Sequence, residues 1–173
     1  MKRLLLLALL LPAFAAAQVT KTANATASVS TITALTLTKT TDLAFGSFTP
    51  SGTQTAPTAA AWNGNATTGS LAITFTLPST LTSVSPSGSV AVTYGTGAAT
   101  YCNGTGCTPT STGAIAFNPA TGLSSASVTA PGDFAVYLCT SPSAGNTGAC
   151  SVNLNGAPAP ATFTGTITLQ VVR

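Results

Sequence analysis

Stretches in which apolar and polar residues alternate recur along the chain, separated by residues that favour turns. The clearest are residues 71–77, 90–94 and 134–138, which are followed directly by proline, glycine and cysteine. Because a period of two places alternate side chains on opposite faces of a strand, each stretch predicts a half-buried β-strand. Shorter stretches of the same kind predict further strands at residues 114–117, 126–129 and 150–154.

Proline and glycine gather between these stretches, for instance at residues 86–88, 119–122 and 131–132, where they predict turns. Beyond residue 17, no stretch of useful length has the apolar period of a helix. Several short strands separated by turns predict an all-β fold, and more narrowly an immunoglobulin-like antiparallel β-sandwich. The predicted core between its two sheets comprises large inward-facing side chains: Phe45, Ile73, Phe75, Val92, Phe134, Val136, Phe163, Ile167 and Leu169.

The C-terminal stretch ATFTGTITLQVVR has the clearest alternation in the chain. Threonines and Gln170 fall on one face, and Gly165 holds an inward place on the other. A last strand this apolar on one face needs a neighbour along its far edge, because an open edge pairs with other chains. The large side chains of that apolar face are Phe163, Ile167, Leu169 and Val171.

The N-terminal ribbon before residue 40 is rich in threonine and carries small apolar residues. Up to residue 29 its apolar positions are odd and are interrupted by Lys21, but at Ile32 and Ala34 they are even. A side chain keeps to one face only while the phase holds. The ribbon therefore predicts an N-terminal β arm within residues 18–30, roughly 36 Å long when extended. It is followed by a sandwich domain, residues 31–173, whose first strand covers residues 32–38.

The first 17 residues have the layout of a secretory signal peptide. A charged start, Lys2 and Arg3, precedes an apolar run over residues 4–11 and the small residues Ala15, Ala16 and Ala17. The apolar run is too short for a permanent transmembrane helix. The sequence therefore predicts cleavage after Ala17, a secreted or cell-surface location, and no membrane span after cleavage.

Charged residues are scarce, at 4% of the chain, and glutamate and histidine are absent. General acid–base catalysis calls for histidine, glutamate or paired carboxylates, whereas the only acids are Asp42 and Asp133. Phosphate-binding loops, hydrolase elbows and zinc-protease helices are missing from the sequence. Lys21, Lys39 and Arg173 form no basic patch for nucleic acid. We therefore expect no enzyme, no cofactor and no nucleic-acid partner.

Four cysteines in an exported chain indicate disulfides, for which three connectivities are possible. Cys102 and Cys107 flank a glycine-rich tetrapeptide, and Cys139 and Cys150 flank a longer stretch rich in serine and glycine. We predict that each pair closes its own loop, because the turn brings the sulfurs together. A metal site is not expected, because the four-residue spacing of the first pair and the lack of histidine do not suit one.

Two short motifs near the ends of the mature chain carry a resemblance: DLAFGSF at residues 42–48, after a threonine-rich strand, and GTITLQV at residues 165–171. In this order they resemble a family of small exported bacterial β-domains of unknown function, itself similar to spore coat U and archaic chaperone-usher pilin domains. The resemblance implies a sandwich without its last strand, whose groove takes the arm of the next subunit. It places the acceptor groove along Phe163, Ile167, Leu169 and Val171, and the donor face at Val19, Ala23, Ala25, Ala27 and Val29. The chain departs from such pilins in its late cysteines and in the small side chains of its arm.

A different class of function rests on Trp62, the chain's single tryptophan, in a stretch that is expected to be a loop or a bulged strand. Exposed in a shallow groove, its ring could stack on a sugar; packed in the core, it would have no ligand. Asn24, Asn65 and Asn103 stand in glycosylation sequons, which arise by chance in a threonine-rich chain, so their modification stays open.

These observations predict a structural subunit of an extracellular surface fibre, pilus-like, or of a coat. The chain's expected partners are further copies of itself, joined head to tail by β-strand addition of the arm, and an export or assembly machinery. Two alternatives stay open from the sequence. The arm could fold back into its own sandwich, or the chain could be a monomeric secreted carbohydrate-binding module or adhesin.

Overall fold

The structure, a computed structural model, describes residues 35–47, 51–56, 58–140, 150–158 and 161–173. The chain divides into residues 1–31 and residues 32–173, and every described residue belongs to the second part. The predicted signal peptide, the predicted arm and Asn24 therefore lie outside the described residues.

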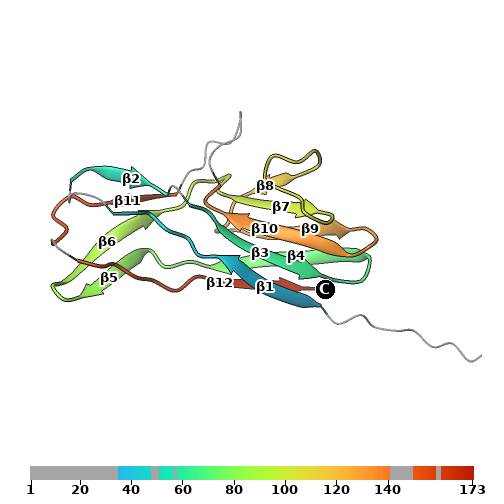
Figure 1. Cartoon of the computed structure of the whole chain (residues 1–173), viewed down its shortest axis with the longest axis horizontal. Helices are drawn as coiled ribbons and strands as arrows, with labels where there is room; N and C mark the ends of the chain where they lie inside the picture. The colour runs from blue at the N-terminus through green and yellow to red at the C-terminus, as the bar shows by residue number, and fades with distance from the viewer. Residues whose placement is uncertain (1–34, 48–50, 57, 141–149, 159–160) are drawn as a thin grey trace, which may run out of the picture. The chain divides into compact units, whose positions relative to one another are not determined.

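Twelve antiparallel β-strands make up the described part of the chain (Figure 1). A helix long and apolar enough to cross a membrane is not found among these residues. The strands are β1 (Thr36–Thr41), β2 (Thr53–Thr55), β3 (Ala60–Asn65), β4 (Gly69–Thr76), β5 (Thr80–Val84), β6 (Ser87–Thr93), β7 (Ala99–Asn103), β8 (Ile115–Phe117), β9 (Leu123–Val128), β10 (Asp133–Leu138), β11 (Ser151–Asn153) and β12 (Thr168–Val172).

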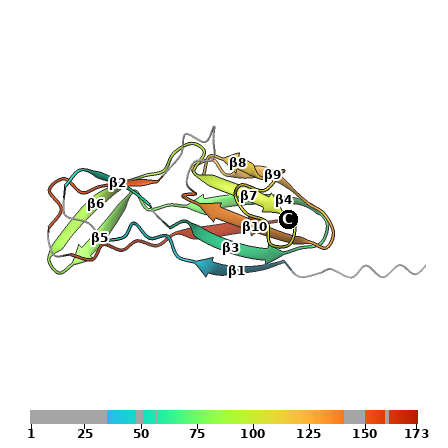
Figure 2. The same ribbon diagram turned by 45° about the horizontal axis from the view of Figure 1, so that its top comes forward.

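Two of the sheets face each other in a sandwich-like arrangement, which Figures 1 and 2 show from two sides. One sheet has the order β1-β3-β10-β7-β8 and the other the order β12-β4-β9. Large side chains from both sheets fill the space between them and are at most 2% exposed, among them Tyr101, Phe134 and Val136 from the first and Leu71 and Ile73 from the second. The all-β class and the antiparallel sandwich expected from the sequence are thus present.

A third sheet, of order β2-β11-β6-β5, holds a second core cluster. The chain crosses between this sheet and the first one three times. It leaves the third sheet from β2 to β3 and from β6 to β7, and it returns from β10 to β11. Its buried residues are Val90 and Val92 of β6, Val152 of β11 and the adjoining Leu154. Only partly buried side chains, including Phe45 and Phe163, pack against this cluster. This second core is therefore less completely covered than the first.

The two predicted disulfides are present. Cys102 pairs with Cys107, five residues apart, and Cys139 pairs with Cys150, eleven residues apart. Each disulfide has one cysteine at or next to the end of a β-strand. Cys102 is the last buried residue of β7, and Cys139 directly follows β10. Cys139 is the one non-glycine residue at positive φ, 64°, among the described residues.

The predicted core is confirmed in part. Ile73, Val92, Phe134 and Val136 are buried, whereas the other five predicted core residues are only half-buried: Phe45, Phe75, Phe163, Ile167 and Leu169. Four of these five lie at the edges of the sheets, because β1 and β12 are the outermost strands of their sheets. Phe45 follows β1, Phe163 and Ile167 precede β12, and Leu169 lies within β12. An edge strand covers its inward side chains from one side only, which explains the difference.

Candidate functional site: a groove between the first and last strands

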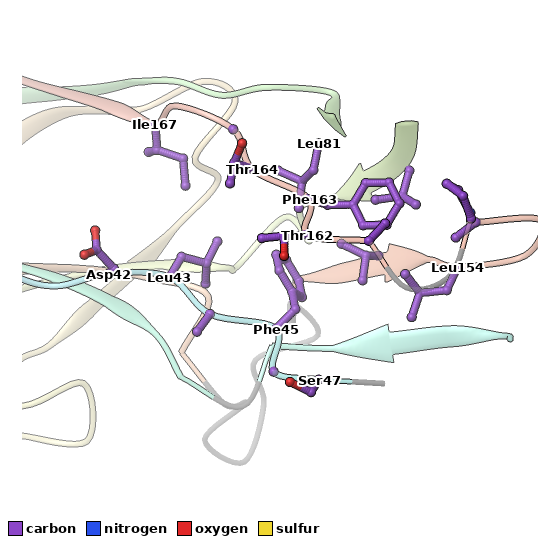
Figure 3. A pocket seen from close by; sticks show the side chains of 18 of the residues that line it. Asp42, Leu43, Phe45, Ser47, Leu81, Leu154, Thr162, Phe163, Thr164 and Ile167 are labelled. Carbon is purple, nitrogen blue, oxygen red and sulfur yellow. The ribbon is translucent and has the colours of Figure 1, made fainter. Parts of the chain in front are cut away.

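An open groove of about 620 Å³ lies between the segment that follows β1 and the segment that leads into β12. Residues 42–47 form one wall and residues 161–167 form the other, and Figure 3 shows the two segments facing each other. The groove thus brings together two parts of the chain that are far apart in the sequence. The first wall falls within the DLAFGSF motif, and the second overlaps the start of the GTITLQV motif.

The floor of the groove is the second core cluster. Val90, Val152 and Leu154 line it, and each is less than 9% exposed. The rings of Phe45 and Phe163 lie over this floor from opposite walls, with Leu81 beside Phe163 (Figure 3). Because the floor itself is already buried, the free energy that an apolar segment would gain in the groove comes from covering the half-buried side chains of the walls, such as Phe45 and Phe163.

Inward-facing side chains on both walls, and on the strands that extend them, share one property. They alternate with exposed residues, as in any half-buried strand, yet they stay partly exposed where the inner strands bury Ile73 and Val136 completely. They are Leu35, Leu37, Leu43 and Phe45 on one side, and Phe163, Ile167, Leu169 and Val171 on the other. The two rows of half-buried apolar residues thus lie along β1 and β12, the outermost strands of their sheets, where an unpaired edge can take up a further strand.

Backbone groups on both walls are also left without backbone partners in the described part of the chain. Thr164 exchanges two hydrogen bonds with Thr82, both of 2.9 Å, so the N–H and C=O groups of its neighbours Phe163 and Gly165 are directed away from β5. On the other wall Ala44 exchanges hydrogen bonds with Thr58, of 3.2 and 3.4 Å, which turns the groups of Leu43 and Phe45 outward in the same way. Within the described residues, these four make no backbone–backbone hydrogen bond.

Gly165 has the inward place that the alternation predicts for it. A Cβ atom there would stand 2.7 Å from Cδ2 of Leu81 and 3.2 Å from Cγ of Pro78. A larger residue would therefore require the side chain of Leu81 to move, and Leu81 lines the groove as well. Glycine at this position leaves room for Leu81 beside the second wall.

Among the described residues that line the groove, the polar side chains are those of Asp42, Ser47, Tyr94, Thr162 and Thr164. Asp42 is the charged one of these, and its carboxylate accepts a hydrogen bond from Lys39 while the Asp42 side chain stays 78% exposed. Tyr94 also lines the groove, and its hydroxyl is buried with no hydrogen-bond partner in the described part of the chain. Burial raises the pKa of Tyr94 to about 12. No cluster of three or more potential metal ligands occurs in that part either.

No protein-family model, curated protein or solved structure matches the chain. The function of the groove must therefore be argued from its own residues.

Of the predicted acceptor-groove residues, Phe163 and Ile167 line the groove, and Leu169 and Val171 continue the same face along β12. The sequence reasoning missed the opposite wall, Leu43 and Phe45, as part of the groove, although both fall in the DLAFGSF motif. It also missed the floor, which no local pattern could reveal because β6 and β11 meet only in the fold. The predicted donor residues lie outside the described residues.

Trp62 is a core residue. It lies in β3, is 7% exposed, and its ring packs at 5.7 Å from the ring of Phe75. A sugar would have no free face to stack on, so Trp62 gives no support to a carbohydrate-binding module. The side-chain amides of the two described sequon residues are hydrogen-bonded, Asn65 to Asp133 and Asn103 to Thr129.

Proposed function

We propose that the chain is a structural subunit of an extracellular fibre or coat, and that its groove receives a β-strand from a neighbouring subunit. The observation that supports this most directly is the pair of facing edges. Half-buried apolar side chains and outward backbone groups coincide on both of them. On this proposal the fold is an immunoglobulin-like sandwich that lacks one edge strand.

Strand addition fits both kinds of group that the groove offers. In this mode the backbone of the incoming strand supplies hydrogen bonds, and its alternate side chains fill the pockets below. The N–H and C=O groups of Phe163 and Gly165, and those of Leu43 and Phe45, are available for such a ladder. A small-molecule ligand would use the apolar floor but would leave these backbone groups without partners.

The proposed occupant is the arm of another copy of the chain. Its inward positions Val19, Ala23, Ala25, Ala27 and Val29 alternate with threonine, serine and asparagine, which would face water. Each subunit then gives one arm and receives one, a head-to-tail contact that does not close and so builds a fibre. The predicted signal peptide and the two disulfides fit assembly outside the cytoplasm.

The experiment that tests this function compares two single charges in the arm of the mature protein. Ala25→Asp puts a carboxylate on the inward face, where it would be buried without a partner. Thr26→Asp, its matched control, puts the same charge on the outward face. We expect Ala25→Asp to lower the fibre yield at least tenfold, measured by sedimentation and electron microscopy, and Thr26→Asp to assemble like the unchanged protein.

Thermal melting of the unassembled protein distinguishes an arm that is donated to a neighbour from an arm that folds back into its own groove. If the arm is donated, Ala25→Asp leaves the melting temperature of the monomer unchanged. If the arm folds back into its own groove, Ala25→Asp lowers the melting temperature of the monomer, whereas Thr26→Asp leaves it unchanged. Fibres that form equally well with Ala25→Asp, or with a chain that starts at Ser30, would rule out the donated arm.

A further inference from the structure

We infer that an ion pair between Lys21 of the incoming arm and Asp42 of the receiving subunit fixes the register and the direction of the arm in the groove. This inference rests on the proposed function, and names the contact by which one copy of the chain recognises the next. It starts from the distribution of charge, which is so sparse that each charged residue can be considered separately.

On the receiving side, the groove has one charged lining residue. Asp42 lies at one end of it, beside Leu43 and on the side toward Ile167 (Figure 3). The remaining lining residues are apolar or uncharged. The chain's other acid, Asp133, does not line the groove, and its carboxylate accepts hydrogen bonds from Asn65 and Thr105.

On the donor side, the arm has one charged residue, and it stands on the inward face. Lys21 has the same odd phase as Val19, Ala23 and Ala25. An inward ammonium group over the apolar floor would be buried without a partner, at a large cost in free energy. At the end of the groove, where the side chain of Asp42 is 78% exposed, the ammonium would keep both water and a carboxylate partner, so the register in which Lys21 reaches Asp42 is favoured over those that place Lys21 above the floor.

Asp42 is able to take a second cation. Its bond to Lys39 joins two exposed side chains three residues apart, 54% and 78% exposed, and such surface pairs contribute little. The bond uses one carboxylate oxygen, Oδ1, and an ionised carboxylate can accept several hydrogen bonds. Lys21 could therefore bind Asp42 without displacing Lys39.

The direction follows from where the groove lies relative to Asp42. Its first wall extends from Asp42 toward Ser47, and none of residues 35–41, the described residues before Asp42, lines it. With Lys21 at Asp42, an arm that runs parallel to residues 42–47 places Ala23 and Ala25 over the floor between Phe45 and Phe163. An arm that runs the other way would bring only Val19 to the floor, because the mature chain is predicted to start at Gln18.

The favoured direction also suits the backbone of the other wall. The two walls run in opposite directions, as Figure 3 shows, so an arm parallel to residues 42–47 is antiparallel to residues 161–167. It can then form an antiparallel ladder with Phe163 and Gly165, whose backbone groups are directed away from β5. Small alanines suit this place because two phenylalanine rings already cover the floor.

Zero-length cross-linking of fibres tests the contact directly. Fibres are assembled from an equal mixture of ¹⁵N-labelled and unlabelled mature protein and treated with a water-soluble carbodiimide, which joins an ammonium to a carboxylate only when they touch. We expect a peptide linking Lys21 to Asp42 in which about half of the copies combine one labelled and one unlabelled chain. The Lys39–Asp42 pair within one subunit is the internal control, and its product contains no mixed copies.

A charge exchange tests whether the contact fixes the register. Lys21→Asp and Asp42→Lys, each alone, should slow fibre assembly at least tenfold, and the double variant should recover most of the rate. Lys39→Ala, which removes the nearby cation, should change the rate less than twofold.

The outcomes separate this inference from the function on which it rests. Fibres that form without the Lys21–Asp42 product, and that the double variant does not rescue, overturn the ion pair and leave strand donation standing. A Lys21–Asp42 product with no mixed copies shows the arm in its own groove and overturns the contact between subunits. Absence of fibres from the unchanged protein, under conditions that keep it folded and oxidised, overturns both.

Discussion

At the scale of single residues, Phe134 and Phe163 differ in how completely the two core clusters bury them. Phe134 is 2% exposed, and its ring lies so close to Gly64 that no Cβ would fit there. Phe163 is half-buried and lines the groove. We expect Phe134→Ala to lower the free energy of unfolding by about 3–5 kcal/mol, as for other buried phenylalanines. Phe163→Ala should cost the monomer clearly less, because part of its ring is already in water.

Urea unfolding of both variants as monomers measures this difference, and fibre yield measures what Phe163 does in the assembly. Phe163→Ala should weaken assembly more than it weakens the monomer. An equal loss of stability in the two variants would mean that the groove is already filled in the monomer. That result would favour an arm folded back on its own subunit.

At the scale of elements, the sequence predicted the strands whose side chains alternate in size. Residues 71–77, 90–94 and 134–138 correspond to β4, β6 and β10, with ends shifted by a few residues. It missed β7, which reads ATYCN, and left the AAWNGN stretch of β3 open between a loop and a bulged strand. In β7 four consecutive residues are buried, so no alternation marks it. In β3 the small residues take their strand geometry from β1 and β10 on either side.

Of the groove, too, one part could be predicted from the sequence and another part could not. Phe163 and Ile167 could be predicted because the C-terminal stretch alternates regularly between apolar and polar residues. The floor could not, because Val90 and Val152 become neighbours only through the pairing of β6 with β11. Short β2 and β5 escaped prediction too, since threonine and serine dominate both and leave little contrast between faces.

The two disulfides also act at the scale of elements, and their loss should differ in size. Chain entropy alone predicts a loss of about 2 kcal/mol for the loop of Cys102–Cys107 and about 3 kcal/mol for that of Cys139–Cys150. Cys139 adds a second effect, because it is held at φ 64°, a region that costs non-glycine residues about 1–2 kcal/mol. When Cys150 is replaced by alanine, Cys139→Gly should therefore be more stable than Cys139→Ala.

Guanidinium unfolding of the three double variants, Cys102→Ala/Cys107→Ala and the two at Cys139 and Cys150, gives these differences. A glycine variant no more stable than its alanine counterpart would contradict the strained backbone at position 139. A larger loss at Cys102–Cys107 than at Cys139–Cys150 would contradict the ranking by loop length.

At the scale of the whole molecule, the scarcity of charge bears on the proposed assembly and on the response to pH. Few charges leave few ways to discriminate one register of a strand from the next, since alanines and threonines pack alike at every second step. On the proposed function, Lys21 and Asp42 would then decide the register, which a densely charged surface would not allow. The same scarcity limits how many groups can couple folding to protons.

The last prediction follows from the carboxylate of Asp133. Hydrogen bonds from Thr105 and then Asn65 lower the pKa of this group. A carboxyl whose pKa is lower in the folded protein stabilises the fold above its unfolded pKa of about 3.9, and this stabilisation is lost as the pH falls through the lowered value. With no glutamate or histidine in the chain, melting temperatures should be level between about pH 5 and 7 and should fall below about pH 4. In Asp133→Asn, whose amide does not titrate, the fall should be smaller, and a fall as steep as that of the unchanged protein would assign the acid sensitivity to other carboxyl groups.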